Sequence, residues 1–458
     1  MNIEELKLRA AAGDAEAQFE LGKCYDKGED IKQDEEAAVL WLQKSAEQGY
    51  APAQRLLGEC YNFGIGIELN YEEAVKLWHL AAKQGDVIAQ FNLGTNYWSG
   101  LGVEQNQEKA VSQWQEIADK LPAAQNNLGY CYQKGFVFEQ NYEEAVKWYR
   151  LAAEQGEAFA AHNLAICYRM GYGVEQNHEE AFKWELLAAE EGNDEAQYNV
   201  GNAYKRGEGV EQNFEEAVKW WRLAAEQGFA DAQYYLGCAY ANGDGVEQNY
   251  EEAVKWCRLA AEQGNGQAQY NLGRCYERGV GVRQNMDESV KWYKLAAEQG
   301  CVEVQKKLGG LYLRGEGVEK NYKEASKWIL LAAEQNDISS QSIMGIIYHN
   351  GDGVEQNDEE AVKWWRLAAE RGDADAQCYL GCAYANGDGV EQNYEEAVKW
   401  WRLAAEQGCA GAQYYLGCAY GNGDGVEQND EEAVKWYRLA AERGDEDAKE
   451  ALKRLQNE

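Results

Sequence analysis

Twelve cysteines are the residues of this chain with the widest choice of chemistry. Thiols bind soft metals, form disulfides or act as nucleophiles. Five of them follow, by two residues, the second residue of an LG or LA pair, where other copies of that pair have alanine. Because cysteine and alanine exchange at one small position, we interpret these thiols as packed core groups. They are Cys24, Cys60, Cys131, Cys167 and Cys275.

A metal centre or a catalytic site is not favoured by the remaining candidates. Cys378 and Cys382 form an i, i+4 pair with Cys418 further on, but the sequence offers no fourth ligand nearby. The loop NGDGVEQNYE resembles a calcium loop, yet Tyr240 stands where its first aspartate is needed. The four histidines occupy unrelated positions of the pattern described next. We therefore predict no metal, no cofactor and no catalytic residue, and so no enzyme.

The elements that carry these residues repeat along the chain. LG or LA pairs, replaced by VG at Gly201 and MG at Gly345, give twelve copies between Gly22 and Gly417, at steps of 36 residues with one step of 35. A fixed period of this size is typical of solenoids. The copies at 230–264 and 374–408 differ only at Tyr234 versus Cys378 and at Cys257 versus Trp401.

Each copy predicts two helices joined by a tight turn. The first, ADAQYYLGCAYANG at 230–243, has a helical apolar stripe and ends at glycine. The second begins at Asn249, with Glu252 placed to complete a capping box, and we expect it to bury Ala253, Val254, Trp256 and Leu259–Ala261. One hairpin cannot bury this face alone, so we expect the copies to stack.

A tryptophan recurs in the second helix of every copy. We expect these tryptophans to share one position and to act as a core wedge between neighbouring copies. They are Trp41, Trp78, Trp114, Trp148, Trp184, Trp220, Trp256, Trp292, Trp328, Trp364, Trp400 and Trp436.

The pattern A-x-x-x-LG-x-x-Y-x-x-G-x-GV, followed by A-V-x-W-x-x-x-A-A-x-x-G, resembles the Sel1-like repeat family, a branch of the tetratricopeptide-like solenoids. The resemblance implies a right-handed α-solenoid superhelix of twelve repeats whose first helices line a concave groove. It also implies scaffold or adaptor function and supplies no catalytic residues. We expect an N-terminal capping helix at 1–13, the repeats at 14–444 and a C-terminal capping helix at 445–458.

The groove-facing side of a tetratricopeptide-like first helix lies three residues before the LG glycine and one, four and five after it. These positions hold eleven basic and three acidic residues, a net charge of +8 (11 − 3) within a chain of net charge −35. We predict that the middle of the stripe binds a protein or peptide that is acidic or has aromatic anchors. The candidate residues are Arg169, Tyr198, Lys205, Arg206, Tyr234, Tyr270, Arg274, Arg278, Lys306 and Arg314.

Alternatives to this prediction stay open. The basic stripe could only balance acidic neighbours, and the chain could be an inhibitor or immunity-type protein that wraps a toxin or enzyme. The acidic composition, with a pI near 4.6, disfavours nucleic acid and membrane surfaces as partners. We expect no signal peptide and a cytoplasmic location, with export into a host cell left open. The partner's identity and the oligomeric state are not determined by the sequence.

Overall fold

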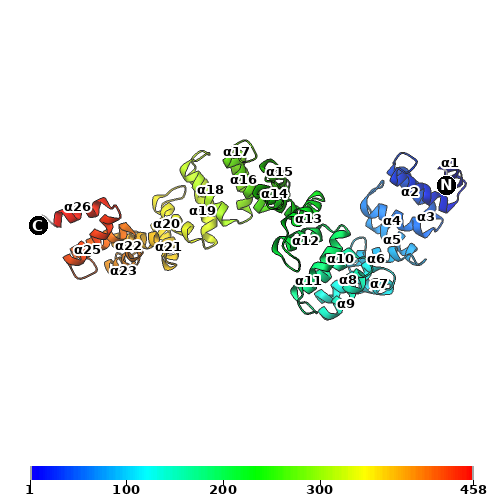
Figure 1. Cartoon of the computed structure of the whole chain (residues 1–458), viewed down its shortest axis with the longest axis horizontal. Coiled ribbons are helices and arrows are strands. Elements are labelled where there is room, and N and C mark those ends of the chain that lie inside the picture. The colour runs from blue at the N-terminus through cyan, green and yellow to red at the C-terminus, as the bar shows by residue number, and fades with distance from the viewer. Residues whose placement is uncertain (1–2, 456–458) are drawn as a thin grey trace. The chain divides into compact units, whose positions relative to one another are not determined.

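The computed structural model describes residues 3–455 and consists of α-helices joined by short loops (Figure 1). These residues form 26 helices and no strand, and each predicted copy forms one helical hairpin. The predicted all-α solenoid is confirmed. Residues 1–2 and 456–458, which belong to the predicted capping segments, lie outside the described residues. No helix within residues 3–455 has both the length and the apolarity that crossing a bilayer requires.

The chain divides into two compact units, Met1–Ala232 with Asp244–Val246, and Gln233–Gly243 with Glu247–Glu458. In the first unit, hairpins follow one leading helix. Its helices are α1 (Ile3–Ala11), α2 (Ala15–Lys27), α3 (Glu35–Glu47), α4 (Ala51–Phe63), α5 (Tyr71–Ala82), α6 (Val87–Ser99), α7 (Gln107–Ile117), α8 (Pro122–Lys134), α9 (Tyr142–Ala153), α10 (Ala158–Met170), α11 (His178–Glu190), α12 (Asp194–Arg206) and α13 (Phe214–Glu226).

The second unit continues the same pattern and ends with one additional helix. The division between the units falls inside its first helix, α14. Its helices are α14 (Ala230–Asn242), α15 (Tyr250–Glu262), α16 (Gly266–Arg278), α17 (Met286–Glu298), α18 (Val302–Arg314), α19 (Tyr322–Glu334), α20 (Ile338–Asn350), α21 (Asp358–Glu370), α22 (Ala374–Asn386), α23 (Tyr394–Glu406), α24 (Ala410–Asn422), α25 (Asp430–Glu442) and α26 (Glu446–Leu455).

The first helix of a hairpin is delimited by its capping residues, as α22 illustrates. The side chain of Asp373 accepts a hydrogen bond from the backbone N–H of Ala376, which satisfies one free amide of the first turn. The helix ends at Gly387, whose φ of 81° lies in the left-handed region that favours glycine. The predicted glycine stop is therefore confirmed.

The second helix begins at an asparagine, as predicted, but with half of the expected capping box. In α23 the Asn393 side chain accepts a hydrogen bond from the Glu396 backbone N–H at 3.0 Å. The Asn393 backbone N–H donates to the carbonyl of Tyr384 at 2.8 Å, and the Glu396 carboxylate pairs with Lys399. The tight loop thus supplies the partner that the glutamate was expected to provide.

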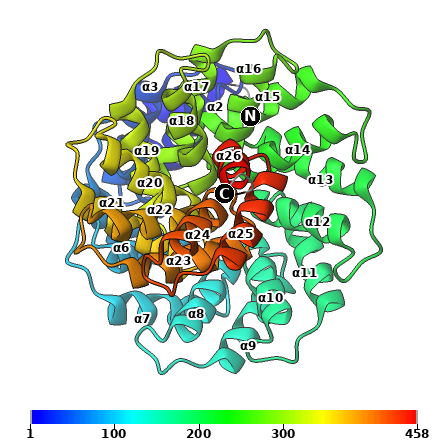
Figure 2. The ribbon, with the colours of Figure 1, turned by 90° about the vertical axis from the view of Figure 1, so that its left-hand side faces the viewer.

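A buried glutamine on the first helix donates a hydrogen bond to a backbone carbonyl of the preceding hairpin, as α22 illustrates. Gln377 on α22 donates to the carbonyl of Ala369 on α21 at 3.0 Å, and it accepts at 2.8 Å from Gln407, which ends α23 of the same hairpin. Figure 2 shows α21 to α25 following one another in this order, and consecutive helices of this run are in contact. The same arrangement recurs at Gln269 and Gln305, whose buried amides are paired through both nitrogen and oxygen. Gln341 and Gln413 donate in the same way, but their amide oxygens have no hydrogen-bond partner within residues 3–455.

The prediction of a single tryptophan position is wrong. Trp78 and Trp114 lie 20 residues after the LG glycine and face it, whereas the other ten tryptophans of the set lie 19 residues after it. Of those ten, only Trp292 and Trp328 are buried, and the others are half-buried. One residue along a helix rotates the side chain by about 100°, so the two positions have different neighbours.

The predicted buried face of the second helix is also wrong in part. Leu259 is 38% exposed, and Leu223, Leu367 and Leu403, at the same position of other hairpins, are exposed as well. Trp256 is half-buried, while Ala253, Val254, Ala260 and Ala261 are buried as expected. The leucine lies on the side of the helix away from the first helices, so it does not join the core.

Candidate functional site

The residue 20 positions after the second residue of the pair is here called the ring position. Its side chain occupies the space between the two helices of a hairpin, beside that glycine or alanine. A ring at this position packs against the glycine, so closely at Gly58 and Gly381 that a Cβ there would collide with it. Eight hairpins have an aromatic residue, two have an aliphatic one, and two have neither. The residues are Leu42, Trp78, Trp114, Tyr149, Glu185, Trp221, Cys257, Tyr293, Ile329, Trp365, Trp401 and Tyr437.

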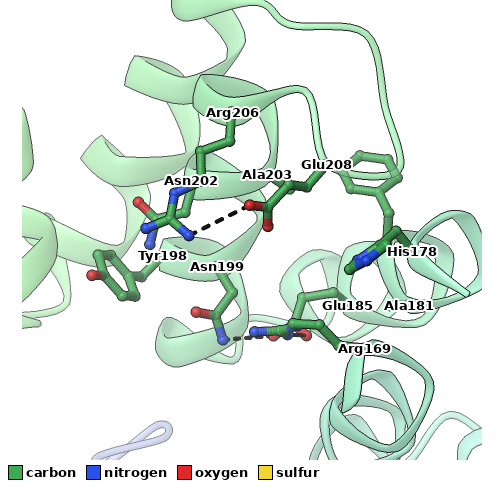
Figure 3. Close-up of a pocket in the computed structure, with 11 residues that line it drawn as sticks. Arg169, His178, Ala181, Glu185, Tyr198, Asn199, Asn202, Ala203, Arg206 and Glu208 are labelled. Carbon is green, nitrogen blue, oxygen red and sulfur yellow. Dashed lines mark hydrogen bonds and ion pairs between the residues drawn. The ribbon is translucent and has the colours of Figure 1, made fainter. Parts of the chain in front are cut away.

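Pockets are present at both hairpins that lack an aromatic or aliphatic residue at the ring position. The Glu185 pocket, of about 240 Å³, lies among α10, α11 and α12 (Figure 3). The Cys257 pocket, of about 360 Å³, lies among α14, α15 and α16, and its lining residues all belong to the second unit. The two pockets are equivalent, because Asn199 and Arg206 line the first and Asn271 and Arg278, 72 residues on, line the second.

The Glu185 pocket is built on a buried carboxylate. The Glu185 side chain is 4% exposed. Its Oε1 accepts hydrogen bonds from Asn199 Nδ2 at 2.9 Å and makes a 2.7 Å contact with His162 Nδ1, while Oε2 pairs with Arg169 Nη2 at 2.5 Å. Figure 3 shows Arg169 and Asn199 converging on the Glu185 carboxylate. Both oxygens are thus compensated, as a buried charge requires.

The protonation of His162 follows from this arrangement. Burial alone would lower the pKa of the imidazole, but the hydrogen bond to Glu185 and the charge of that carboxylate raise it above its ordinary value. The buried carboxylate therefore favours the imidazolium form of His162, which faces it directly.

The mouth of the Glu185 pocket presents groups that a bound molecule could use. Oδ1 of Asn202 is buried and has no hydrogen-bond partner within residues 3–455. Arg206 is 59% exposed and lies 3.5 Å from the carboxylate of Glu208, the pair marked in Figure 3. One free acceptor and one exposed guanidinium thus lie on the same wall.

The Cys257 pocket has a more positive mouth. Arg274 and Arg278 both line it, and within the described part of the chain neither has a carboxylate within 4.0 Å. The Arg274 guanidinium lies over the ring of Tyr270, 5.6 Å from its centroid. Burial raises the pKa of the Cys257 thiol, so this group is neutral and apolar at pH 7.

The ten residues predicted for the groove fall into two sets. Arg169, Tyr198 and Arg206 line the Glu185 pocket, and Arg274 and Arg278 line the Cys257 pocket. The other five line neither and contact nearby side chains: Lys205 with the Trp221 ring, Tyr234 with Gln267, Tyr270 with Tyr293, Lys306 with Asp337, and Arg314 with Glu316.

Several residues of these pockets were not identified from the sequence. Glu185, Cys257, Asn202 and Asn271 all line a pocket, and His162 holds the buried carboxylate from behind it. A signal was present: aligning the second helices by their alanines shows one acid and one cysteine in a column of large apolar side chains. Aligning them by tryptophan conceals that column.

From the sequence we considered Cys378 and Cys382 together with Cys418, but the structure places a different cysteine beside this pair. Cys378 and Cys382 pack with Cys409, whereas Cys418 lies with Tyr414 and Tyr437. A hydrogen bond with Cys378 lowers the pKa of the Cys409 thiol to about 6, although burial opposes the shift. Across residues 3–455 no group of three or more histidine, cysteine or acidic residues has the geometry of a metal site.

Stacked helical hairpins of fixed length define the chain as an α-solenoid repeat protein. The model of the Sel1 repeat matches twelve consecutive segments, and the chain therefore belongs to the Sel1 repeat family. The matched residues are 15–50, 51–86, 87–112, 122–157, 158–193, 194–229, 230–265, 266–301, 302–337, 338–373, 374–409 and 410–445. Proteins built from Sel1 repeats generally mediate protein–protein interactions.

Solved structures of the same family resemble the chain over most of its length. A protective antigen of uropathogenic Escherichia coli with an SLR fold is 34% identical, with a TM-score of 0.62 over 100% of this chain and 90% of that one. A Sel1 repeat protein from Oxalobacter formigenes is 32% identical over 68% of this chain and 89% of that one, with a TM-score of 0.47. A comparison with curated proteins finds no match.

An immunity protein from Pseudomonas aeruginosa is more distant. It is 22% identical over 47% of this chain and 84% of that one, with a TM-score of 0.30.

Proposed function

We propose that the chain is a non-enzymatic scaffold or adaptor whose first helices bind an acidic partner protein or peptide with aromatic anchors. The observation that carries the proposal is the recurrence of one pocket in two hairpins, with an arginine at the same place on each. Arg206 and Arg278 occupy these equivalent places, and both are exposed. Arginine is enriched among the hot spots of protein interfaces.

The positive charge of the predicted stripe on the first helices also supports an acidic partner. The predicted stripe is basic in a chain of net charge −35, so an acidic partner would meet its most favourable potential there. Lys306 and Arg314 already pair with carboxylates and contribute less than the sequence count implies. Arg274 and Arg278 have no such partner within residues 3–455, which makes them the stronger candidates.

Charge reversal tests the proposal. The variant carrying Arg206→Glu, Arg274→Glu and Arg278→Glu should lose its partner in affinity purification from the source cell while its helicity is unchanged. The matched control is Lys219→Glu, Lys255→Glu and Lys291→Glu, which makes the same change of charge on second-helix lysines that are 65%, 61% and 62% exposed. Equal capture by the first variant and by the unmodified chain would overturn the proposal.

The inhibitor or immunity interpretation remains a prediction. It requires that the captured partner is an enzyme or toxin and that the chain suppresses its activity at a one-to-one ratio. Activity measured with and without the chain separates this outcome from a scaffold, which binds its partner without inhibiting it.

A further inference from the structure

The α14–α15 and α22–α23 hairpins have nearly the same sequence but different space beside the glycine. Residues 230–264 and 374–408 differ at two of 35 positions, Tyr234 versus Cys378 and Cys257 versus Trp401. Their glycines, alanines and capping residues are the same. Since the helices also have equal lengths, we attribute the difference in space to the side chains.

In the α22–α23 hairpin the chain fills this space with its own ring. Trp401 is 6% exposed and lies against Gly381. It stacks on Tyr415 of α24, with centroids 5.4 Å apart and planes at 20°. An indole ring is thus the natural occupant of this position in the fold.

In the α14–α15 hairpin the corresponding space is open. Cys257 stands at the ring position, and a pocket of about 360 Å³ remains beside Gly237. Tyr234 does not line this pocket: its ring packs edge-on against Tyr235, and its hydroxyl donates to Gln267 at 3.3 Å. The volume lies in the lower range of small-molecule pockets, enough for one aromatic group.

The helix that follows the α14–α15 hairpin, α16, adds positive charge to the open pocket. The equivalent helix α24 adds no such charge to the α22–α23 hairpin. Where α24 has Tyr415, Cys418 and Asn422, α16 has Asn271, Arg274 and Arg278. Both arginines line the pocket, and within residues 3–455 neither is in an ion pair. Two guanidinium groups beside an apolar cavity match a planar ring with an anionic group attached.

We propose that the Cys257 pocket binds an aromatic side chain of the partner that has a carboxylate beside it. The ring occupies the space that Trp401 fills in the other hairpin, and the carboxylate pairs with Arg274 and Arg278. This proposal rests on the proposed function, since it names the chemistry of the partner segment. The carboxylate comes from the end of the partner chain or from an adjacent acidic residue.

Fluorine NMR on the full chain tests the proposal with small probes. N-acetyl-5-fluorotryptophan has both ring and carboxylate, and its amide has the ring alone. We expect saturable line broadening of the acid, with an affinity at least tenfold higher than that of the amide. A third probe, N-acetyl-aspartyl-5-fluorotryptophan amide, distinguishes the two sources of the carboxylate, because it binds only if an adjacent acidic side chain suffices.

Variants assign the binding to this pocket. Cys257→Trp should lower the affinity for the acid at least tenfold, because the chain's own ring then fills the space. Cys257→Tyr is a second filling variant, since tyrosine occupies the ring position in three other hairpins. The double variant Arg274→Gln and Arg278→Gln should bind the acid no better than the amide. Circular dichroism confirms that each variant remains helical.

Three results would overturn the proposal: no binding of either probe that has a carboxylate, binding of both of these probes no tighter than that of the simple amide, or unchanged binding after Cys257→Trp and Cys257→Tyr. Partner capture that depends on the arginines, without probe binding, would leave the proposed function standing and reject only the pocket. If the probes bind but partner capture does not depend on the arginines, the pocket would stand as a binding site and the proposed function would be rejected.

Discussion

The α22–α23 and α14–α15 hairpins are two nearly identical segments, one filled and one open. Trp401 closes the first against Gly381, and Cys257 leaves the second with a pocket beside Gly237. Both keep the same helix lengths of 13 residues. The backbone is held by caps, alanines and glutamines, so the ring position is free to vary. A solenoid repeat can thus gain or lose a pocket through a single side chain.

The α10–α11 hairpin adds a third state to this comparison. Its ring position holds Glu185, whose carboxylate is bound by His162, Arg169 and Asn199. The pocket there is smaller, about 240 Å³ against about 360 Å³, and its floor is charged. We expect the two pockets to accept different partner groups for this reason.

Opening the filled hairpin should have the largest effect. Trp401→Cys should lower the free energy of unfolding by about 3–5 kcal/mol, because it removes a buried ring and leaves a cavity. Hydrogen exchange of α22 and α23 amides measures this locally, since long repeat arrays do not unfold in one step. Trp400→Cys, at a half-buried residue, is the control and should cost clearly less. Equal losses would mean that the ring position has no special role.

Removing the buried carboxylate of the Glu185 pocket should have the second-largest effect on stability. Glu185→Ala leaves His162 and Arg169 without their carboxylate and should cost about 2–3 kcal/mol, below the cost for a fully buried pair because the Arg169 side chain is 33% exposed. Urea unfolding combined with exchange of α10–α12 amides measures the loss. Glu190→Ala, at an exposed residue of the same helix, should change stability by no more than about 0.5 kcal/mol.

Filling the open hairpin should have a small effect of opposite sign. Cys257→Trp should raise the free energy of unfolding by about 1 kcal/mol, because the ring buries apolar surface in space that already exists. Urea unfolding against the unmodified chain measures it. A loss of more than about 1 kcal/mol would show that Asn271 and Arg274 cannot accommodate the ring as Tyr415 does in the other hairpin.

The pH dependence of the α10–α11 hairpin should show the smallest effect. The pKa of His162 is raised in the folded chain, so its contribution to stability is complete below the unfolded pKa of about 6.5. That contribution is lost as the pH rises through the higher folded pKa. The protection factors of α10 and α11 amides should therefore fall above about pH 6.5 relative to those of α22 and α23. Glu185→Gln should reduce the difference, because only Glu195, whose carboxylate lies 3.7 Å from His162 Nε2, still favours the imidazolium form. An unchanged slope would contradict this assignment.

Much of the fold could be predicted from short-range pattern. The repeat period is visible directly in the sequence. The glycine that ends the first helix and the asparagine that begins most second helices act on residues within one turn of each other. The buried glutamines were missed, because a polar side chain in a helix gives no local sign of a partner 30 residues away. Five of the ten groove candidates line the two pockets and five do not, and partner binding by this stripe remains a prediction.

The sequence by itself determined that the chain folds into stacked helical hairpins, because helix ends and apolar spacing are local properties. Only the tertiary structure decided which of two adjacent residues faces the glycine, why Arg169 turns to Glu185, and where Cys257 leaves a pocket. Neighbouring side chains on a helix point about 100° apart, and which of them meets the facing helix depends on how the two helices cross. That crossing is fixed by contacts among three helices, which no single stretch of sequence contains.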